Sequence, residues 1–422
     1  MNRTRVVWCG VVAALLLGGG PTPTRGDIEP GAQVDKSNAS QVEELVSPGI
    51  LWCVDHGMNM TIVPYRRIEW DRAYKEATEK YAPQVSLAAD GRTLEGYVAG
   101  LPFPVIDPND PQVALKIMWN YDHKPYFSDD ADLRNFDADT GTIRDGGLEV
   151  ERHYLLDHLR TLMYVGRLYV DPKPEIPNTD GIRAKSSLHP ILEPFDMKGV
   201  GLTGIRYLNP DRQDDTWLYV PTLRRLRRLS NSQRTDSLFG QDTDIDSIGG
   251  YAGQIPWLDW KYLGEKTMLG SFHSEQFPVK YCEGGGQFAF CDAWEKRPVY
   301  VIEGTPRQGQ YAYAKRVLYI DKETYLITYT DLYDRAGRLW KVWINQYGFR
   351  KRAGAGYGID YPDEMPFNHS IAMVDMQLSH GTRWALPSAA YPGEEGWYFN
   401  QGEKTGLTEE FFTLGHLLSA SH

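Results

Sequence analysis

The chain has 422 residues, of which 41% are hydrophobic and 24% are charged, an ordinary globular composition for one large domain or two. A formal net charge of −11 makes nucleic acid and anionic lipid surfaces poor general partners. Aromatic residues reach 12%, which favours a large β-sheet and also suits half-wet surfaces and cavities.

The first 26 residues have the order of groups that is typical of a cleavable export signal. Arg3 and Arg5 form a basic start, and an apolar run over 11–17 is followed by glycines. This run is too short to serve as a permanent membrane anchor. We therefore expect a signal peptide over 1–26 and a single exported domain over 27–422.

Cys9 is the only cysteine in this segment, and it lies before the apolar run ends. A lipid anchor needs a cysteine directly after the cleavage point, so we expect none. The mature protein is then expected to be soluble and exported.

Two helices are predicted in the first third of the chain. Over 70–81, Trp70, Tyr74 and Ala77 fall on one face. A second helix is predicted to begin with Asp110 as its cap and Pro111 in the first helical position.

Three segments give weaker patterns. Residues 121–147 are acidic and rich in turn formers, so we expect loops there. Residues 150–170 fit a helix or a strand, and 164–170 is the better strand. Residues 348–422 are expected to form extended loops that wrap the sheet.

A predicted hairpin leads into a basic run. Residues 197–208 and 215–220 fit two paired strands, and Trp217 and Tyr219 share one face of the second. After Pro221, three leucines interleave with four arginines: Arg224, Arg225, Arg227 and Arg228.

The arginine run has three interpretations. On a helix the leucines would be buried and the arginines would face water. On a strand the arginines would alternate between faces, and some could pair with an anionic headgroup inside a half-open barrel. In the third interpretation they contact an acidic partner surface.

Asp242, Asp244 and Asp246 have the spacing of the first ligands of a calcium loop, but Ser247 stands where glycine is expected and Gly253 where the closing acid is expected. We therefore expect a solvated loop and no metal ion. The chain contains no nucleophile elbow, P-loop, dinucleotide fingerprint or H-E-x-x-H motif, so no catalytic residue and no cofactor is predicted.

Cys282 and Cys291 flank a short glycine-rich stretch, and in an oxidising compartment this spacing suits a disulfide. A bridge closing so short a loop would stabilise the fold by about 2–3 kcal/mol. The alternative, a metal or redox pair, is disfavoured because no C-x-x-C spacing is present. Cys53 is expected to be a buried thiol.

Residues 314–320, 325–333 and 338–345 predict three consecutive antiparallel strands. In the last strand, large apolar side chains occur on both faces, Trp343 on one and Val342 on the other. Such a sheet must be covered twice or curve around something apolar.

Several strings together resemble the domain-of-unknown-function family 1329, which is related to the periplasmic outer-membrane lipoprotein-sorting proteins of the LolA and LolB group. The matching strings are ATEKY at 77–81, AGLPFP at 99–104, KIMWN at 116–120, DTWLYVPTLRRLRRL at 215–229 and LYIDKETY at 318–325.

The resemblance implies a mainly β fold with helices (α+β), a curved, incomplete antiparallel β-barrel with helices on its concave side. It also implies a periplasmic, non-enzymatic binding or carrier protein for a hydrophobic molecule such as a lipid, an acyl chain or a sterol-like compound. An inner-membrane exporter or an outer-membrane protein is the expected transport partner. The alternatives are a non-catalytic envelope scaffold and, less favoured, a lipid-modifying enzyme. The residues proposed to bind a ligand are Trp217, Tyr219, Arg224, Arg225, Arg227 and Arg228.

Overall fold

The computed structural model describes residues 28–145, 147–230, 233–282, 287–307, 309, 311–352, 358–391 and 396–419. The predicted signal peptide over 1–26 lies outside these residues. Within them, no helix has both the length and the apolar character needed to cross a membrane.

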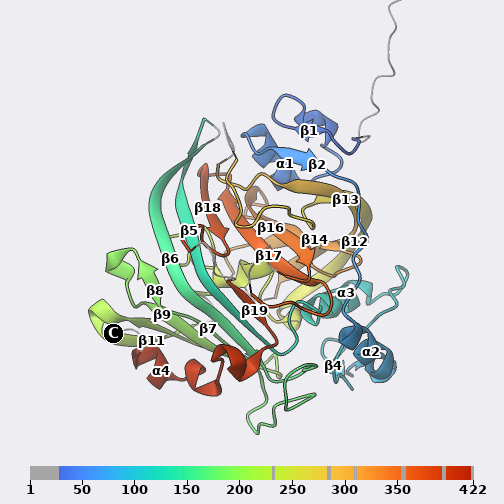
Figure 1. Ribbon diagram of the computed structural model, residues 1–422. Coiled ribbons are helices and arrows are strands. Elements are labelled where there is room, and N and C mark those ends of the chain that lie inside the picture. Colours follow the sequence, from blue (N-terminus) through green and yellow to red (C-terminus); the bar gives the residue numbers. More distant parts are fainter. Residues whose placement is uncertain are drawn as a thin grey trace, which may run out of the picture.

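One large, curved antiparallel sheet makes up most of the molecule (Figure 1). Each strand in it pairs with the next in an antiparallel sense. In spatial order the strands are β11 (Arg225–Leu229), β10 (Asp215–Val220), β9 (Gly201–Tyr207), β7 (Ile182–Leu188), β6 (Gly147–Met163), β5 (Asp130–Arg144), β18 (His380–Ala385), β17 (Met365–Asp375), β16 (Leu339–Arg350), β15 (Ile327–Tyr333), β14 (Lys315–Asp321), β13 (Ala293–Pro306) and β12 (Leu258–Gly270).

Short strands extend this sheet at its margins. β8 (Ile191–Glu193) pairs with β6, and β19 (Trp397–Phe399) pairs with β5. β2 (Met60–Ile62) runs parallel to one end of β13 and also pairs with β1 (Gln33–Val34). A separate hairpin is formed by β3 (Ser86–Leu87) and β4 (Leu94–Glu95).

The sheet does not close, because β11 and β12 lie at its two ends and do not pair with each other in the described part of the chain. These two strands are nevertheless consecutive in the sequence. The residues between them, of which 230 and 233–257 are described, connect one edge of the sheet to the other and are called the crossing segment below. The predicted curved, incomplete antiparallel barrel is confirmed.

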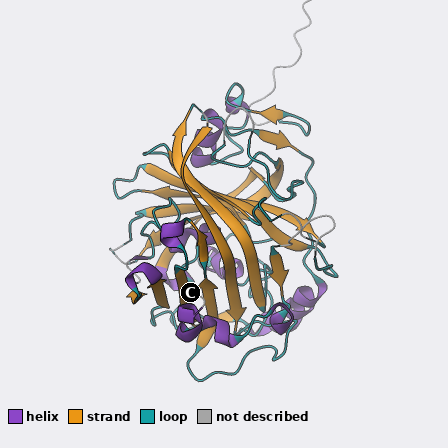
Figure 2. Ribbon diagram, turned by 60° about the vertical axis from the view of Figure 1, so that its left-hand side comes forward, coloured by secondary structure: helices purple, strands orange, loops and turns teal. Residues whose placement is uncertain are grey.

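Among the described residues, four α-helices pack around the sheet (Figure 2): α1 (Pro48–Asp55), α2 (Arg72–Tyr81), α3 (Val113–Asp122) and α4 (Leu414–Ser419). Both predicted helices are present, as α2 and α3. The second begins at Val113 and not at Pro111, because the Asp110 carboxylate accepts a hydrogen bond from the Gln112 amide, at 2.7 Å, in a preceding turn.

The acidic segment predicted as loops is instead the long strand β5, and this prediction was wrong for two reasons. Asn135 has a positive φ of 52°, and the residues that pack into the apolar cluster are Ala131 and Leu133 before it but Phe136 and Ala138 after it, so the alternation of inward and outward residues changes phase there. The acids are also paired across the sheet: Asp132 lies opposite Arg160 on β6, and Asp139 lies opposite His153.

Cation contacts keep these strand acids ionised. Burial alone would raise the pKa of Asp132, but the hydrogen bond with His158 and the charge of Arg160 hold it at about 2.

β6 ends at Met163, so the strand predicted over 164–170 is absent. That segment is irregular because the Asp129 carboxylate accepts hydrogen bonds from the backbone amides of residues 168–170.

The C-terminal residues predicted as wrapping loops contain two interior strands of the sheet, β17 and β18. Every residue of β17 is buried, so its sequence shows none of the polar alternation that marks a half-exposed strand. The three strands predicted over 314–345 are present as β14, β15 and β16.

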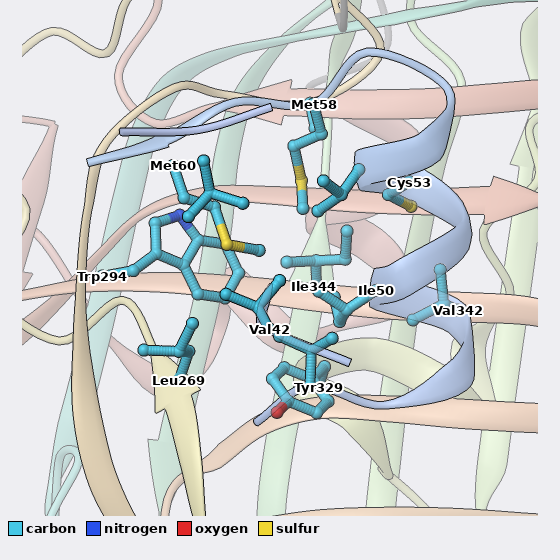
Figure 3. Packing of buried hydrophobic residues seen from close by; sticks show 14 of the residues in the cluster. Val42, Ile50, Cys53, Met58, Met60, Leu269, Trp294, Tyr329, Val342 and Ile344 are labelled. Atoms are coloured by element: carbon cyan, nitrogen blue, oxygen red, sulfur yellow. The ribbon is translucent and has the colours of Figure 1, made fainter. Parts of the chain in front are cut away.

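Helix α1 packs on the face of β16 that bears Val342 and Ile344 (Figure 3). Ile50 and Cys53 point from the helix into this cluster and are fully buried, as predicted for Cys53. Cys282 and Cys291 form the predicted disulfide.

A buried carboxyl group lies beneath the start of α1. Asp331 on β15 is fully buried; its Oδ1 accepts a hydrogen bond from the hydroxyl of Ser47, the cap of α1, at 2.8 Å, and its Oδ2 has no partner among the described residues. Burial raises the pKa of Asp331 to about 7. The folded state therefore holds this proton up to neutral pH, whereas an unfolded aspartate loses it near pH 4.

We expect Asp331→Asn to remove a pH dependence of stability. Between pH 4 and 7 the folded wild type binds more protons than the unfolded chain, so its unfolding free energy falls as the pH rises. The amide is neutral throughout, so the variant should gain on the order of 3 kcal/mol relative to wild type between pH 4 and pH 8. Urea unfolding at the two pH values measures this. Asp55 is exposed on α1, and Asp55→Asn is the control. If both variants change in unfolding free energy by the same amount between the two pH values, the expectation is wrong.

Candidate ligand-binding cavity

A cavity of about 440 Å³ lies between the concave face of the sheet and the crossing segment. Its walls come from β5, β6, β7, β9 and β10 on one side and from β16, β17 and β18 on another. Residues after α3 and several residues of the crossing segment complete the lining.

The strand register places apolar side chains in rows across this wall. Leu159 on β6 lies opposite Leu188 on β7, which lies opposite Leu202 on β9. Residues directly opposite in neighbouring strands share a face, so these three side chains form one continuous row. Trp343 and Trp384 line the far side of the cavity. These residues therefore give the cavity an apolar wall that suits an apolar chain or ring.

The crossing segment is fixed to the sheet by buried charges. Asp246 accepts hydrogen bonds from Arg316 on β14 at 2.6 Å, from Arg234 at 3.2 Å and from the Tyr311 hydroxyl at 3.0 Å. The Arg316 guanidinium also donates to the Gly250 carbonyl, at 3.2 Å. These contacts hold residues 245–253, part of the cavity lining, against the sheet.

The other two aspartates of the predicted calcium-like loop are also buried. Asp242 contacts His380, at 2.8 Å, and Thr382 on β18, and this contact raises the pKa of His380. Burial raises the pKa of Asp244, which accepts from the Tyr313 hydroxyl. The prediction of a solvated loop was wrong, because these polar residues are matched by partners on the sheet. Within the described residues no group of three or more His, Cys, Asp or Glu side chains could hold a metal ion.

One side of the cavity carries charge. Arg183 contacts Asp122 at 2.6 Å, whereas Arg206 and Arg234 both contact Asp214, at 2.8 and 3.0 Å. Burial alone would raise the pKa of Asp214, but Arg206 and Arg234 lower it below its usual value.

The six residues predicted to bind a ligand lie on the hairpin of β10 and β11. Trp217 and Tyr219 lie opposite Thr203 and Gly201, on the face of the sheet that points away from the cavity, where α4 packs. None of the six lines the cavity. Their contact with a ligand stays a prediction.

The arginine run is a strand, so the helical interpretation was wrong. Arg225 and Arg227 lie opposite Val220 and Leu218, on the cavity side of this edge strand, and both are exposed. Arg228 lies on the other side with Trp217 and contacts Asp215. Arg224 sits in the turn before β11 with a positive φ of 47°.

Sequence reasoning missed the cavity residues, because strands far apart in the sequence supply them. The alternation of Leu159, Thr161 and Met163 on β6 was a usable signal. The row that they form with β7 and β9 depends on the register, which no local pattern specifies.

We expect Asp246→Asn to destabilise the protein by about 3–5 kcal/mol, because it leaves the Arg316 guanidinium buried without its carboxylate. Urea unfolding at pH 7 measures the loss. Asp259→Asn removes an exposed contact with Arg307 and should cost less than about 1 kcal/mol. Equal losses of unfolding free energy in the two variants would show that the buried Asp246 contact stabilises the protein no more than the exposed one.

The chain is similar in sequence or in structure to several known proteins. Uncharacterized protein PA3922 of Pseudomonas aeruginosa is 24% identical over 324 residues, which cover 73% of this chain and 67% of the relative. An outer membrane lipoprotein-sorting protein domain from Vibrio parahaemolyticus is similar with a TM-score of 0.48 and 19% identity, over 72% of this chain and 98% of that one. LolA superfamily protein NE2245 from Nitrosomonas europaea gives a TM-score of 0.40 and 14% identity, over 72% and 98%. The model of the family described as protein of unknown function (DUF1329) matches residues 33–417, and the chain therefore belongs to this family.

Proposed function

We propose that this protein is a periplasmic carrier that holds the apolar part of one hydrophobic molecule, such as a lipid or an acyl chain, in the cavity. The observation that carries the proposal is the cavity itself. Its volume of about 440 Å³ lies within the range of small-ligand sites, and its wall is a row of leucines faced by two tryptophans.

The energetics suit reversible binding. Burial of about 300 Å² of chain surface contributes about 7 kcal/mol at 25 cal/mol per Å², before the cost of ordering the ligand is subtracted. The remaining affinity falls in the micromolar range or weaker. A carrier needs such an affinity, since it must release its ligand as well as capture it.

Two features support a periplasmic location. The first residues have the composition of an export signal. Independently, Cys282 and Cys291 form a disulfide, and such bonds persist in oxidising compartments such as the bacterial periplasm.

The polar groups of the cavity support binding over catalysis. Asp122 and Asp214 each contact an arginine within 3.0 Å. Arg183 outweighs the effect of burial and lowers the pKa of Asp122. A carboxylate held ionised by an arginine is a weak proton acceptor, so neither is suited to general acid–base work at neutral pH.

The second candidate function is a non-catalytic scaffold of an export system. The four exposed arginines of the β10–β11 hairpin favour it, because they form a basic surface outside the cavity. On this proposal Arg224, Arg225, Arg227 and Arg228 contact an acidic surface of an exporter or an outer-membrane protein.

We expect Ala184→Trp to weaken the binding of a hydrophobic probe at least tenfold. Ala184 lines the cavity beside Met163, and an indole at this position would occupy the space of the ligand. Fluorescence titration of the delipidated protein with N-phenyl-1-naphthylamine, an uncharged probe, measures the affinity. Ala336→Trp, in the exposed turn between β15 and β16, should bind like wild type.

Two other outcomes would contradict the proposal. Equal affinities of wild type and Ala184→Trp would place the probe elsewhere. A wild-type protein that takes up neither the probe nor any added lipid would exclude the carrier function and leave the scaffold function.

A further inference from the structure

Lys124 differs from every other cation in the cavity wall. Four cationic side chains line the cavity among the described residues, and three of them, Arg183, Arg206 and Arg234, contact a carboxylate at 3.0 Å or less. The Lys124 Nζ has no carboxylate oxygen of the described residues within 4.0 Å.

The contacts that Lys124 does make leave most of its capacity unused. Its Nζ donates one hydrogen bond to the carbonyl of Tyr121, at 3.0 Å, and lies 3.8 Å from the centre of the Tyr121 ring. An ammonium group has three donors, so two are left for another partner. Burial lowers the pKa of Lys124 to about 8, so the group is still mainly protonated at pH 7.

The surroundings of Lys124 decide what that partner is. Tyr126 and Phe127 follow it in the sequence and line the same cavity, which continues toward Leu133 and Trp343. A charged group beside a long apolar wall matches a molecule with an ionic end and an apolar tail. An anionic end would gain a charge-assisted hydrogen bond in a partly desolvated place, where such a bond is strong.

We infer that the cavity binds a single-chain amphiphile with an anionic head group, and that the head group contacts the Lys124 ammonium while the chain lies along the apolar wall. This inference rests on the proposed carrier function and specifies its substrate class. The competing explanation is structural. Lys124 follows the C-terminal end of α3, where a lysine satisfies a free carbonyl of the helix, and it would then play no part in ligand choice.

The test compares ligands that share a chain and differ in the head group. Dodecanoate, dodecyl phosphate, 1-dodecanol and dodecyltrimethylammonium displace N-phenyl-1-naphthylamine from delipidated protein at pH 7. Wild type should bind dodecanoate or dodecyl phosphate at least tenfold more tightly than 1-dodecanol, and the cationic amphiphile most weakly. The two anions separate a carboxylate ligand from a phosphate ligand.

Lys124→Met should reduce the affinity for the anions about tenfold, to that of 1-dodecanol, and leave 1-dodecanol unchanged. Lys124→Gln keeps a donor to the Tyr121 carbonyl without the charge and should behave in the same way. Lys185→Met is the matched control: Lys185 lies on β7 between the cavity residues Ala184 and Ser186, but its Nζ contacts Glu409, at 2.9 Å. This control should keep the preference for anions.

The outcomes separate the two proposals. If wild type binds 1-dodecanol as tightly as dodecanoate, the head-group inference is wrong and the carrier function stands. An anion preference that survives in both Lys124 variants also overturns the inference. If no amphiphile binds to wild type, the carrier function itself fails. Should the variants not fold, equal affinities of wild type for the anions and for 1-dodecanol would still overturn the inference.

Discussion

The contact between Asp246 and Arg316 is the one on which the arrangement of the cavity depends. An open curved sheet leaves its concave face exposed unless another part of the chain covers it. Here the covering part is the crossing segment between the two edge strands, which has few long apolar runs of its own. A buried carboxylate paired with a buried guanidinium fixes it in one position, and neither charge is tolerated there without the other. This pair therefore holds the crossing segment, which lines part of the cavity, against the sheet.

The two faces of the sheet border different parts of the structure at neighbouring residues. Val342 and Ile344 lie under α1 on one face, whereas Trp343 between them lines the cavity on the other. The sequence pattern, with large apolar side chains on both faces, allowed either a double cover or an apolar concavity. Both are realised. One face is covered by the side chains of α1, and the other borders the cavity.

Sequence reasoning recovered the parts of the fold that depend on local patterns. The hairpin of β9 and β10 and the meander of β14 to β16 were predictable, because turn residues and alternating strands are adjacent in the sequence. β5 was not, because the change of phase at Asn135 hides the alternation and because Asp132 and Asp139 find their cations on another strand. β17 was missed because a strand buried on both faces has no polar period.

The candidate site was harder to predict than the fold. Leu159, Leu202 and Trp384 meet in one cavity although long stretches of sequence separate them. The hairpin of β10 and β11 was proposed as a ligand site because of its aromatic and basic composition. The register of β10 with β9 places Trp217 and Tyr219 on the face opposite the cavity. Lys124 gave no signal in the sequence, since its distinction is the lack of a nearby carboxylate in the described structure, and only the fold reveals that.

The same basic run has a second consequence, which concerns self-association. β11 is an edge strand, and an edge strand offers unpaired backbone groups to any other strand that approaches. If two copies met edge to edge through β11, their exposed arginines would lie close together, and the repulsion of like charges would oppose the pairing. The other edge strand, β12, also carries exposed charged residues, Asp259, Lys261 and Glu265, and charged side chains on an edge strand disfavour pairing with another strand. Charged side chains at both edges of this unclosed barrel thus oppose its polymerisation into a continuous sheet.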